Sequence, residues 1–224
     1  MILGIDTSLG TAVAVVEPDG LVRSEAASAD PLAHAEVIGL LLEAVIGDAV
    51  MAPIGGSEAS GESVAPITHV AAGMGPGPFT GLRVGIAAAR AFALGRAIPV
   101  VPVPSHDAAA LSVLLAAPFD APRPFAIVTD ARRRELAYTV YDGLDDDGLP
   151  VRTAGPLLAP RDELDERLRE VGAERRDIAS ISAAMIALAA GRAVAAGRVL
   201  TDGEPLYLRA PDVTLPGARK KVGS

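Results

Sequence analysis

The chain of 224 residues is half apolar, which is enough to bury the core of one substantial domain or of two small ones. Its 28 acidic residues outnumber its 20 basic ones and give a net charge of -8, so a surface that neutralises many phosphates, and with it strong direct binding of nucleic acid, is disfavoured. Because there is no cysteine, disulfides, thiolate metal sites and cysteine nucleophiles are excluded.

The sequence also argues against export and against a membrane anchor. The first residues, MILGIDTSLG, lack the basic start and apolar core of a signal peptide. The most apolar segment elsewhere, residues 178–200, is interrupted by Arg192 and Arg198 and falls short of the ~18 uninterrupted apolar residues that a membrane span needs. We therefore expect a soluble, cytoplasmic protein without a membrane partner.

The first half of the chain predicts three antiparallel strands followed by alternating helices and strands, the order βββαβαβ of an α/β protein. The expected elements are strands at 2–5, at 11–16 and after the PDG turn, an amphipathic helix at 32–47 that stops at Gly47, a strand at 67–72, a helix at 81–94 ended by Gly95 and an edge strand at 97–103. Residues 52–66, rich in Gly, Ser, Glu and Pro, have the composition of a linker.

The second half predicts a further α/β unit. The expected elements are a helix at 106–116, strands at 124–129 and 135–141, an acidic turn at 142–148, and helices near 161–171 and 178–196. Because a strand pair and helices recur, the pattern predicts two similar lobes, at 1–104 and 105–224.

The stretch GMGPGPFTGLRVG, residues 73–85, has the glycine content of a phosphate-binding loop. A Walker loop requires G-x-x-x-x-G-K-[ST] and a dinucleotide loop requires G-x-G-x-x-G, and neither pattern fits. Pro76 and Pro78 donate no N–H, and no lysine is near in the sequence. The residues favour a stiff turn that directs the next helix, over a phosphate cradle.

The helix after this loop carries small residues every four positions. They are Gly81, Gly85, Ala89 and Ala93, while Arg83 and Arg90 share another face with Ile86. A stripe of small side chains permits close approach of another helix or a sheet. The residues leave open whether this stripe forms an interface or packs inside its own chain.

Other candidate motifs are incomplete. Asp6 with Thr7 and Ser8 is similar to D-x-G-x-[ST], the first phosphate motif of actin-like ATPases, but Ser8 replaces the glycine, so a turn-capping aspartate is an equal alternative. The isolated His34, His69 and His106 predict no metal site.

Two further clusters of polar residues carry weak signals. Ser105, His106 and Asp107 have the letters of a catalytic triad, but consecutive residues point in different directions and cannot relay a proton. The three arginines in DARRREL, residues 130–136, would suit an anion or an acidic partner, or a solvated turn. The acidic run at 142–148 lacks the glutamate that closes a calcium loop.

Taken in order and spacing, the segments MILGIDTS, GMGPGPFTGLRVGIAAARAFALGRAIPVVPV, DARRREL with AYTVY, and PLYLRAPDV resemble the TsaB (YeaZ) family of tRNA threonylcarbamoyladenosine biosynthesis proteins. Residues 52–66 look like an insertion, and residues 171–182 match poorly. The matched motif positions are Asp6, Thr7, Ser8, Gly75, Pro76, Gly77, Phe79, Thr80, Gly81, Arg83, Asp130, Arg132 and Arg133.

The resemblance implies a two-lobed α/β protein of the actin-like fold (ASKHA, ribonuclease-H-like), with mixed sheets flanked by helices and without its own catalysis. It implies a partner, the related transferase TsaD, with the ATPase TsaE in a ternary complex. No cofactor of its own is expected, and ATP or ADP would lie at the interface with TsaD. TsaD has a metal-binding H-x-x-x-H after the equivalent strand, whereas here His106 is followed by Ala110 four residues on. Contacts with tRNA would then fall mainly to the partner.

The family packs its first two helices against TsaD or against a second copy of itself, so a homodimer through the same helices is an alternative. On this sequence the resemblance implies an interface made by His34, Ile38, Leu41, Leu42, Gly81, Arg83, Gly85, Ile86, Ala89 and Arg90. The leading hypothesis is a non-catalytic scaffold that binds and stabilises TsaD. The alternatives are an active actin-like ATPase or phosphotransferase that uses Asp6 and the glycine loop, and a peptidase.

Overall fold

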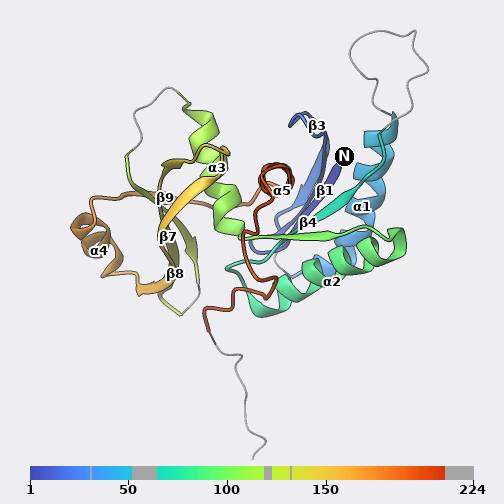
Figure 1. Ribbon diagram of the computed structural model, residues 1–224. Coiled ribbons are helices and arrows are strands. Elements are labelled where there is room, and N and C mark those ends of the chain that lie inside the picture. Colours follow the sequence, from blue (N-terminus) through green and yellow to red (C-terminus); the bar gives the residue numbers. More distant parts are fainter. Residues whose placement is uncertain (31, 52–64, 119–122, 132, 210–224) are drawn as a thin grey trace, which may run out of the picture.

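The structure is a computed structural model that describes residues 1–30, 32–51, 65–118, 123–131 and 133–209. It contains two β-sheets and the helices that cover them (Figure 1). In chain order the elements are β1 (Ile2–Asp6), β2 (Thr11–Val16), β3 (Val22–Ser28), α1 (His34–Met51), β4 (His69–Gly73), α2 (Phe79–Arg96), β5 (Val100–Val103), α3 (Ser105–Ala116), β6 (Phe125–Asp130), β7 (Glu135–Leu144), β8 (Pro150–Pro160), α4 (Leu164–Glu170), β9 (Glu174–Asp177) and α5 (Ala183–Ala195).

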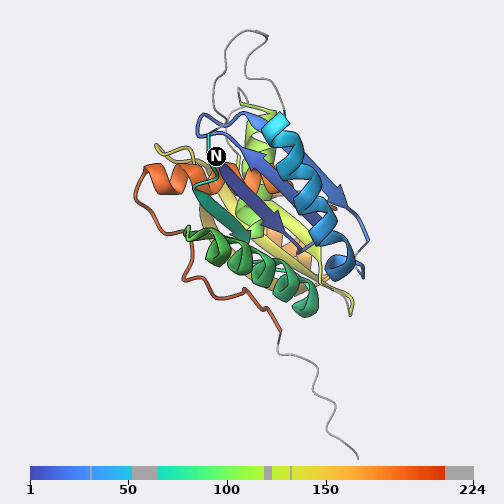
Figure 2. The ribbon, with the colours of Figure 1, turned by 90° about the vertical axis from the view of Figure 1, so that its right-hand side faces the viewer.

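The first sheet has the strand order β3-β2-β1-β4-β5. Strands β1 to β3 form the predicted antiparallel meander, and β4 and β5 continue the sheet in parallel to β1. Every residue of β1 and β2 is buried, because α1 and α2 cover one face of the sheet and α5 covers the other (Figure 2). Burial on both faces explains why the two strands are almost continuous apolar runs.

The second sheet has the strand order β8-β7-β6-β9. Strand β7 is antiparallel to β6 and β8, whereas β9 is parallel to β6. One face packs on α4 through Leu164 and Leu168, and the other faces α3 and α5. Both sheets are therefore mixed and flanked by helices, as the sequence predicted.

Helices α3 and α5 lie between the two sheets (Figure 1). Their buried alanines pack in one cluster with Ile2 of the first sheet and Ile127 of the second. Small side chains on these two helices let both sheets approach closely. Helix α5 belongs to the 105–224 half of the sequence, yet it packs on β1, β2, β4 and β5, so the chain returns to the first sheet after it has built the second.

The first helix does not stop at Gly47, because α1 continues to Met51. Gly47 is exposed, and an added Cβ there would meet no atom within 4 Å, so this glycine interrupts no packing. The apolar face of the helix continues beyond it to Ala49, which is 1% exposed. The glycine was therefore a false stop signal.

Strand β8 has no counterpart among the expected elements, whereas β9 lies within residues 171–182, where the family resemblance implies a strand although the sequence matches poorly. The three prolines of β8, Pro150, Pro156 and Pro160, argued against a strand, but β8 lies at a sheet edge, where missing N–H donors are tolerated. Strand β9, ERRD, has no apolar alternation, and it is held by pairing with β6 and by the ion pair of Arg175 with Asp165 of α4. Among the described residues, no helix is long and apolar enough to span a membrane.

Candidate functional site

Asp6 lies at the end of β1 with its carboxylate sealed inside the protein. Its residue is 2% exposed, and both oxygens accept hydrogen bonds: Ser8 donates to Oδ1 from its backbone N–H at 2.8 Å and from its hydroxyl at 2.5 Å, and Ser105 Oγ donates to Oδ2 at 2.5 Å. Burial raises the pKa of Asp6, and the bonds from Ser105 and Ser8 oppose that rise. The carboxylate is therefore a structural hydrogen-bond acceptor that joins two segments of the chain.

The glycine loop fits tightly around this aspartate. Ser105 Oγ also accepts from Gly75 N–H at 3.0 Å, and Ser105 N–H donates to the Gly75 carbonyl at 2.7 Å. A Cβ on Gly73 would collide with the Asp6 carboxylate, and a Cβ on Gly77 would come within 2.8 Å of Ser8. The glycines at 73 and 77 therefore make room for Asp6 and Ser8, which agrees with a packed turn.

The small-residue stripe of α2 faces the interior of its own chain. Gly81, Gly85, Ala89 and Ala93 are all buried. A Cβ on Gly81 would lie 2.8 Å from His34 Nε2, and one on Gly85 would lie 2.9 Å from Thr7 Cγ2. Thr7 Oγ1 donates to the Gly81 carbonyl at 2.8 Å. Of the two alternatives that the sequence left open, the structure shows packing inside the chain at Gly81 and Gly85, where His34 and Thr7 fill the space.

Most of the ten residues expected at the partner interface are not exposed. His34, Ile38, Gly81, Gly85, Ile86 and Ala89 are buried, and Leu41 and Leu42 are half-buried. Arg83 and Arg90 are exposed. A partner that docks on α1 and α2 would therefore meet these arginines together with residues that the sequence did not single out, among them Leu40 and Leu94, which are 67% and 84% exposed.

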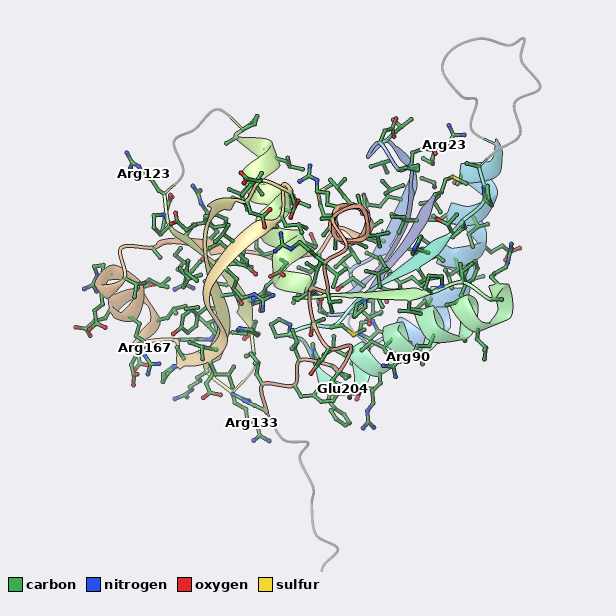
Figure 3. The ribbon with its side chains drawn as sticks, in the orientation of Figure 1. Arg23, Arg90, Arg123, Arg133, Arg167 and Glu204 are labelled. Atoms are coloured by element: carbon green, nitrogen blue, oxygen red, sulfur yellow. The ribbon has the colours of Figure 1, made fainter. Side chains whose placement is uncertain are left out.

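The segment after α5, residues 202–209, runs back across α2; we call it the C-terminal segment. Leu206 N–H donates to the Met74 carbonyl at 2.8 Å, and Arg90 donates to the Gly203 carbonyl at 3.1 Å. Figure 3 labels Arg90 beside Glu204 of this segment. Arg83 lies over the Phe79 ring at 3.8 Å and donates from Nε to Tyr207 Oη at 3.3 Å. Phe79 and Arg83 therefore hold the C-terminal segment.

A cavity of about 580 Å³ separates the glycine loop from the second sheet. Residues 76–81 line one side, and Thr129, Asp130, Ala131 and Arg133 line the other, while Tyr207 to Arg209 close one end. Asp130 accepts a hydrogen bond from Arg161 at 2.6 Å. The structure thus gathers two of the matched motifs, the glycine loop and the start of DARRREL, around one cavity, although Arg132 lies outside the described residues.

Three consecutive polar residues of α3, Ser105, His106 and Asp107, connect the two sheets. Ser105 bonds to Asp6, at the end of β1, and to Gly75, in the glycine loop that follows β4 of the same sheet. His106 is 1% exposed; its Nδ1 lies 2.8 Å from Thr139 Oγ1 and its Nε2 lies 3.0 Å from Thr129 Oγ1. The side chains of Ser105 and His106 therefore point in different directions and bond to different segments of the chain.

Asp107, the third residue, accepts from Tyr141 Oη at 2.7 Å and from Arg152 at 2.7 and 3.2 Å. Burial raises the pKa of Asp107, and the Arg152 guanidinium opposes that rise. Of the other histidines, His34 is buried and His69 is half-buried. In the described part of the chain, no group of three or more His, Cys, Asp or Glu side chains is placed to hold a metal ion.

Comparison with known proteins adds three findings. The family model described as "TsaD: tRNA N6-adenosine threonylcarbamoyltransferase" matches residues 33–148. An uncharacterized protein of Mycobacterium tuberculosis is 34% identical over 167 residues, which are 73% of this chain and 67% of that protein. An uncharacterized protein of Mycobacterium leprae is 32% identical over 170 residues, which are 74% of this chain and 40% of that protein.

Two solved structures share the fold. One is YeaZ from Pseudomonas aeruginosa, with a TM-score of 0.69, 20% identity, and coverage of 92% of this chain and 99% of that one. The other is described as an uncharacterized protein with similarity to peptidase YeaZ, also from Pseudomonas aeruginosa, with a TM-score of 0.67, 22% identity, and coverage of 93% and 99%. Because the family model covers more than half of the chain, the chain belongs to the TsaD-type family, and it shares the fold of the two YeaZ structures.

Proposed function

We propose that this protein is a non-catalytic subunit of the tRNA threonylcarbamoyladenosine machinery, which binds and stabilises a TsaD-type transferase. The observation that carries the proposal is the state of Asp6. The residue in the place of a phosphate-motif aspartate is 2% exposed, and both of its oxygens are bonded to serines inside the protein. A carboxylate that is this deeply enclosed, with both oxygens bonded inside the protein, is poorly placed to ligate a metal ion or to position a water.

The outer surface of α1 and α2 supports the docking part of the proposal. These two helices lie next to each other on one face of the first sheet (Figure 2). Leu40 and Leu94 are largely exposed on them, and Arg83 and Arg90 are exposed on α2. Apolar side chains among cations are typical of the surface at which a protein partner docks. The partner would be TsaD, with TsaE joining the complex, and any ATP or ADP would lie between the subunits.

The test is co-expression with the cognate TsaD, followed by measurement of their association. We expect Leu40→Asp and Leu94→Asp each to weaken association by at least about tenfold, because a carboxylate would be buried at the interface. Val199→Asp is the matched control, since Val199 is 82% exposed but lies beyond α5. Wild-type chains that fail to associate with TsaD, with nucleotide present, would refute the proposal. If both leucine variants bind normally, the interface lies elsewhere.

The same surface offers a second occupant, another copy of this chain. Sedimentation of the isolated protein and of the two leucine variants separates the possibilities. A dimer that dissociates in Leu94→Asp would place the self-contact on α2, and competition between this dimer and TsaD is then expected.

The alternative function, an active actin-like ATPase or phosphotransferase, requires Asp6 to be accessible. Its burial and its serine partners argue against this role. Isothermal titration with Mg-ATP is decisive: saturable binding by the isolated chain that is lost in Asp6→Ala would favour the enzyme over the scaffold.

A further inference from the structure

The cavity described above lies at the N-terminus of α2. This helix is 18 residues long, and its N-cap, Pro78, makes no side-chain hydrogen bond to the first turn. The first N–H groups of any helix have no partner within the helix, and its dipole places partial positive charge there. Phe79, Thr80 and Gly81, which carry these N–H groups, all line the cavity. An anion in the cavity could therefore bind to the N-terminus of α2, without hydrogen bonds from the glycine loop.

His34 supplies an independent reason to expect a ligand. It is 6% exposed and lines the same cavity. Its Nδ1 lies 2.8 Å from Thr11 Oγ1, whereas Nε2 has no hydrogen-bond partner among the described residues. Gly81 leaves room for Nε2, because a Cβ there would lie 2.8 Å from it. When the Thr11 hydroxyl donates to Nδ1, Nε2 carries the proton and is a free donor next to the first turn of α2.

The remaining charges on the wall favour an anion. Arg133 and Arg209 line the cavity from the second sheet and the C-terminal segment, and Arg209 also pairs with Glu135. Among the described residues, the lining holds one acidic side chain, Asp130, which pairs with Arg161. Figure 3 labels Arg133 at the end of the second sheet nearest the C-terminal segment. Two arginines and one aspartate of the described residues thus line the cavity, in a chain whose net charge is -8.

We propose that the cavity binds a small organic oxyanion, a carboxylate or a phosphate monoester attached to an apolar body. The charged head would accept hydrogen bonds from the α2 N-terminus and from His34 Nε2, close to Arg133. The apolar body would pack against Leu158 and Tyr207, which line the cavity. The volume of about 580 Å³ suits a ligand of this size.

The proposal involves residues of this chain alone, so it is tested on the full chain without TsaD. Isothermal titrations with phenyl phosphate and with benzoate distinguish the two kinds of head group, and benzyl alcohol is the uncharged control. We expect saturable binding of at least one anion and none of the alcohol. The anion that binds identifies the head group.

Two variants locate the site. His34→Asn keeps a group near Thr11 but removes Nε2, and Arg133→Met removes an exposed cation; each should weaken binding about tenfold, the typical loss of one charge-assisted bond. Arg167→Met, an exposed arginine of α4 paired with Glu163, is the control and should bind normally. The proposal is overturned if neither anion binds, if benzyl alcohol binds as well as the anions, or if binding is the same in both variants as in the wild type.

Discussion

The ring of Tyr207 packs against the ring of Phe79, with centroids 4.6 Å apart and planes tilted by 40°. This contact joins two motifs that are far apart in the sequence, the glycine loop at residues 73–85 and PLYLR at residues 205–209. Arg83 completes it, because its guanidinium lies over Phe79 and its Nε donates to Tyr207 Oη. The motif residues Phe79 and Arg83 thus have a role within the chain.

Removal of the Tyr207 ring should destabilise the protein. Tyr207→Ala deletes the aromatic contact, the hydrogen bond from Arg83 and part of the packing against the apolar core between the first sheet and helices α1 and α2. We expect a loss of about 1–3 kcal/mol in the free energy of unfolding. Tyr207→Phe keeps the ring and loses only an exposed hydrogen bond, so its loss should stay below about 1 kcal/mol. Urea unfolding measures both. Equal losses in the two variants would show that the ring contact contributes nothing.

Two glycines of α2 should respond to alanine in opposite directions. Gly85→Ala places a Cβ against Thr7, which is 1% exposed and bonded to Gly81, so we expect a loss of about 1–3 kcal/mol. Gly95→Ala meets no atom within 4 Å and replaces a poor helix former, so we expect a gain of up to about 1 kcal/mol. Thermal unfolding compares them. A neutral Gly85→Ala would show that the stripe is not tightly packed against Thr7.

The sequence predicted the first sheet well because its signals are local. Apolar runs, turn residues and helical spacing each depend on neighbours in the chain, and they identified the meander of β1 to β3, the helices α1, α2 and α3, and the strand pair β6 and β7. Strands β8 and β9 depend on tertiary pairing. The local sequence of β8, which contains prolines, does not indicate that it will pair with β7. The polar sequence of β9 likewise does not indicate that it will pair with β6.

The site was harder to predict than the fold, because side-chain partners come from distant segments. The four-residue repeat of Gly81, Gly85, Ala89 and Ala93 correctly indicated close packing, but no local pattern identifies Thr7 as the group that fills the space. In the same way, the bond between Asp6 and Ser105 spans 99 residues. Asp6, which the sequence singled out as a weak phosphate motif, and Ser105, which it singled out as part of an apparent triad, are joined by one hydrogen bond.

Ser105→Ala should destabilise the fold, and more so at higher pH. The change removes the donor to Asp6 and the acceptor for Gly75 N–H, and we expect a loss of about 2–4 kcal/mol. The folded-state pKa of Asp6 is raised, so the contribution of this group to stability falls as the pH rises from 3.8 through the folded-state pKa. The hydrogen bond from Ser105 opposes the raised pKa, so without Ser105 the pKa should be higher still and the loss of stability with rising pH should be larger. Chemical unfolding near about pH 4 and pH 8 measures the difference.

Ser112→Ala on the exposed part of α3 is the control and should change the free energy of unfolding by less than about 0.5 kcal/mol at either pH. If the deficit of Ser105→Ala is the same at both pH values, the serine does not act on the ionised form of Asp6.

His106 should make the protein sensitive to acid. Burial, and to a lesser extent the charge of Arg152, lowers the pKa of His106 from 6.5 to about 3. The folded state therefore binds fewer protons than the unfolded state between these values, so the stability that comes from the neutral histidine is complete above 6.5 and is lost as the pH falls towards 3. The loss approaches about 1.4 kcal/mol per pH unit for one proton.

The raised pKa values of Asp6 and Asp107 act in the opposite direction, so the histidine is isolated by comparison with a variant. His106→Gln keeps hydrogen-bonding atoms near Thr129 and Thr139 but cannot titrate. Although its stability at neutral pH should be lower, its free energy of unfolding should depend less steeply on pH below 6.5 than that of the wild type. Urea unfolding at several pH values measures both slopes. Parallel slopes would contradict the prediction, because they would mean that protonation of His106 costs the folded protein no free energy. We expect such a cost because His106 is buried and both ring nitrogens contact threonine hydroxyls.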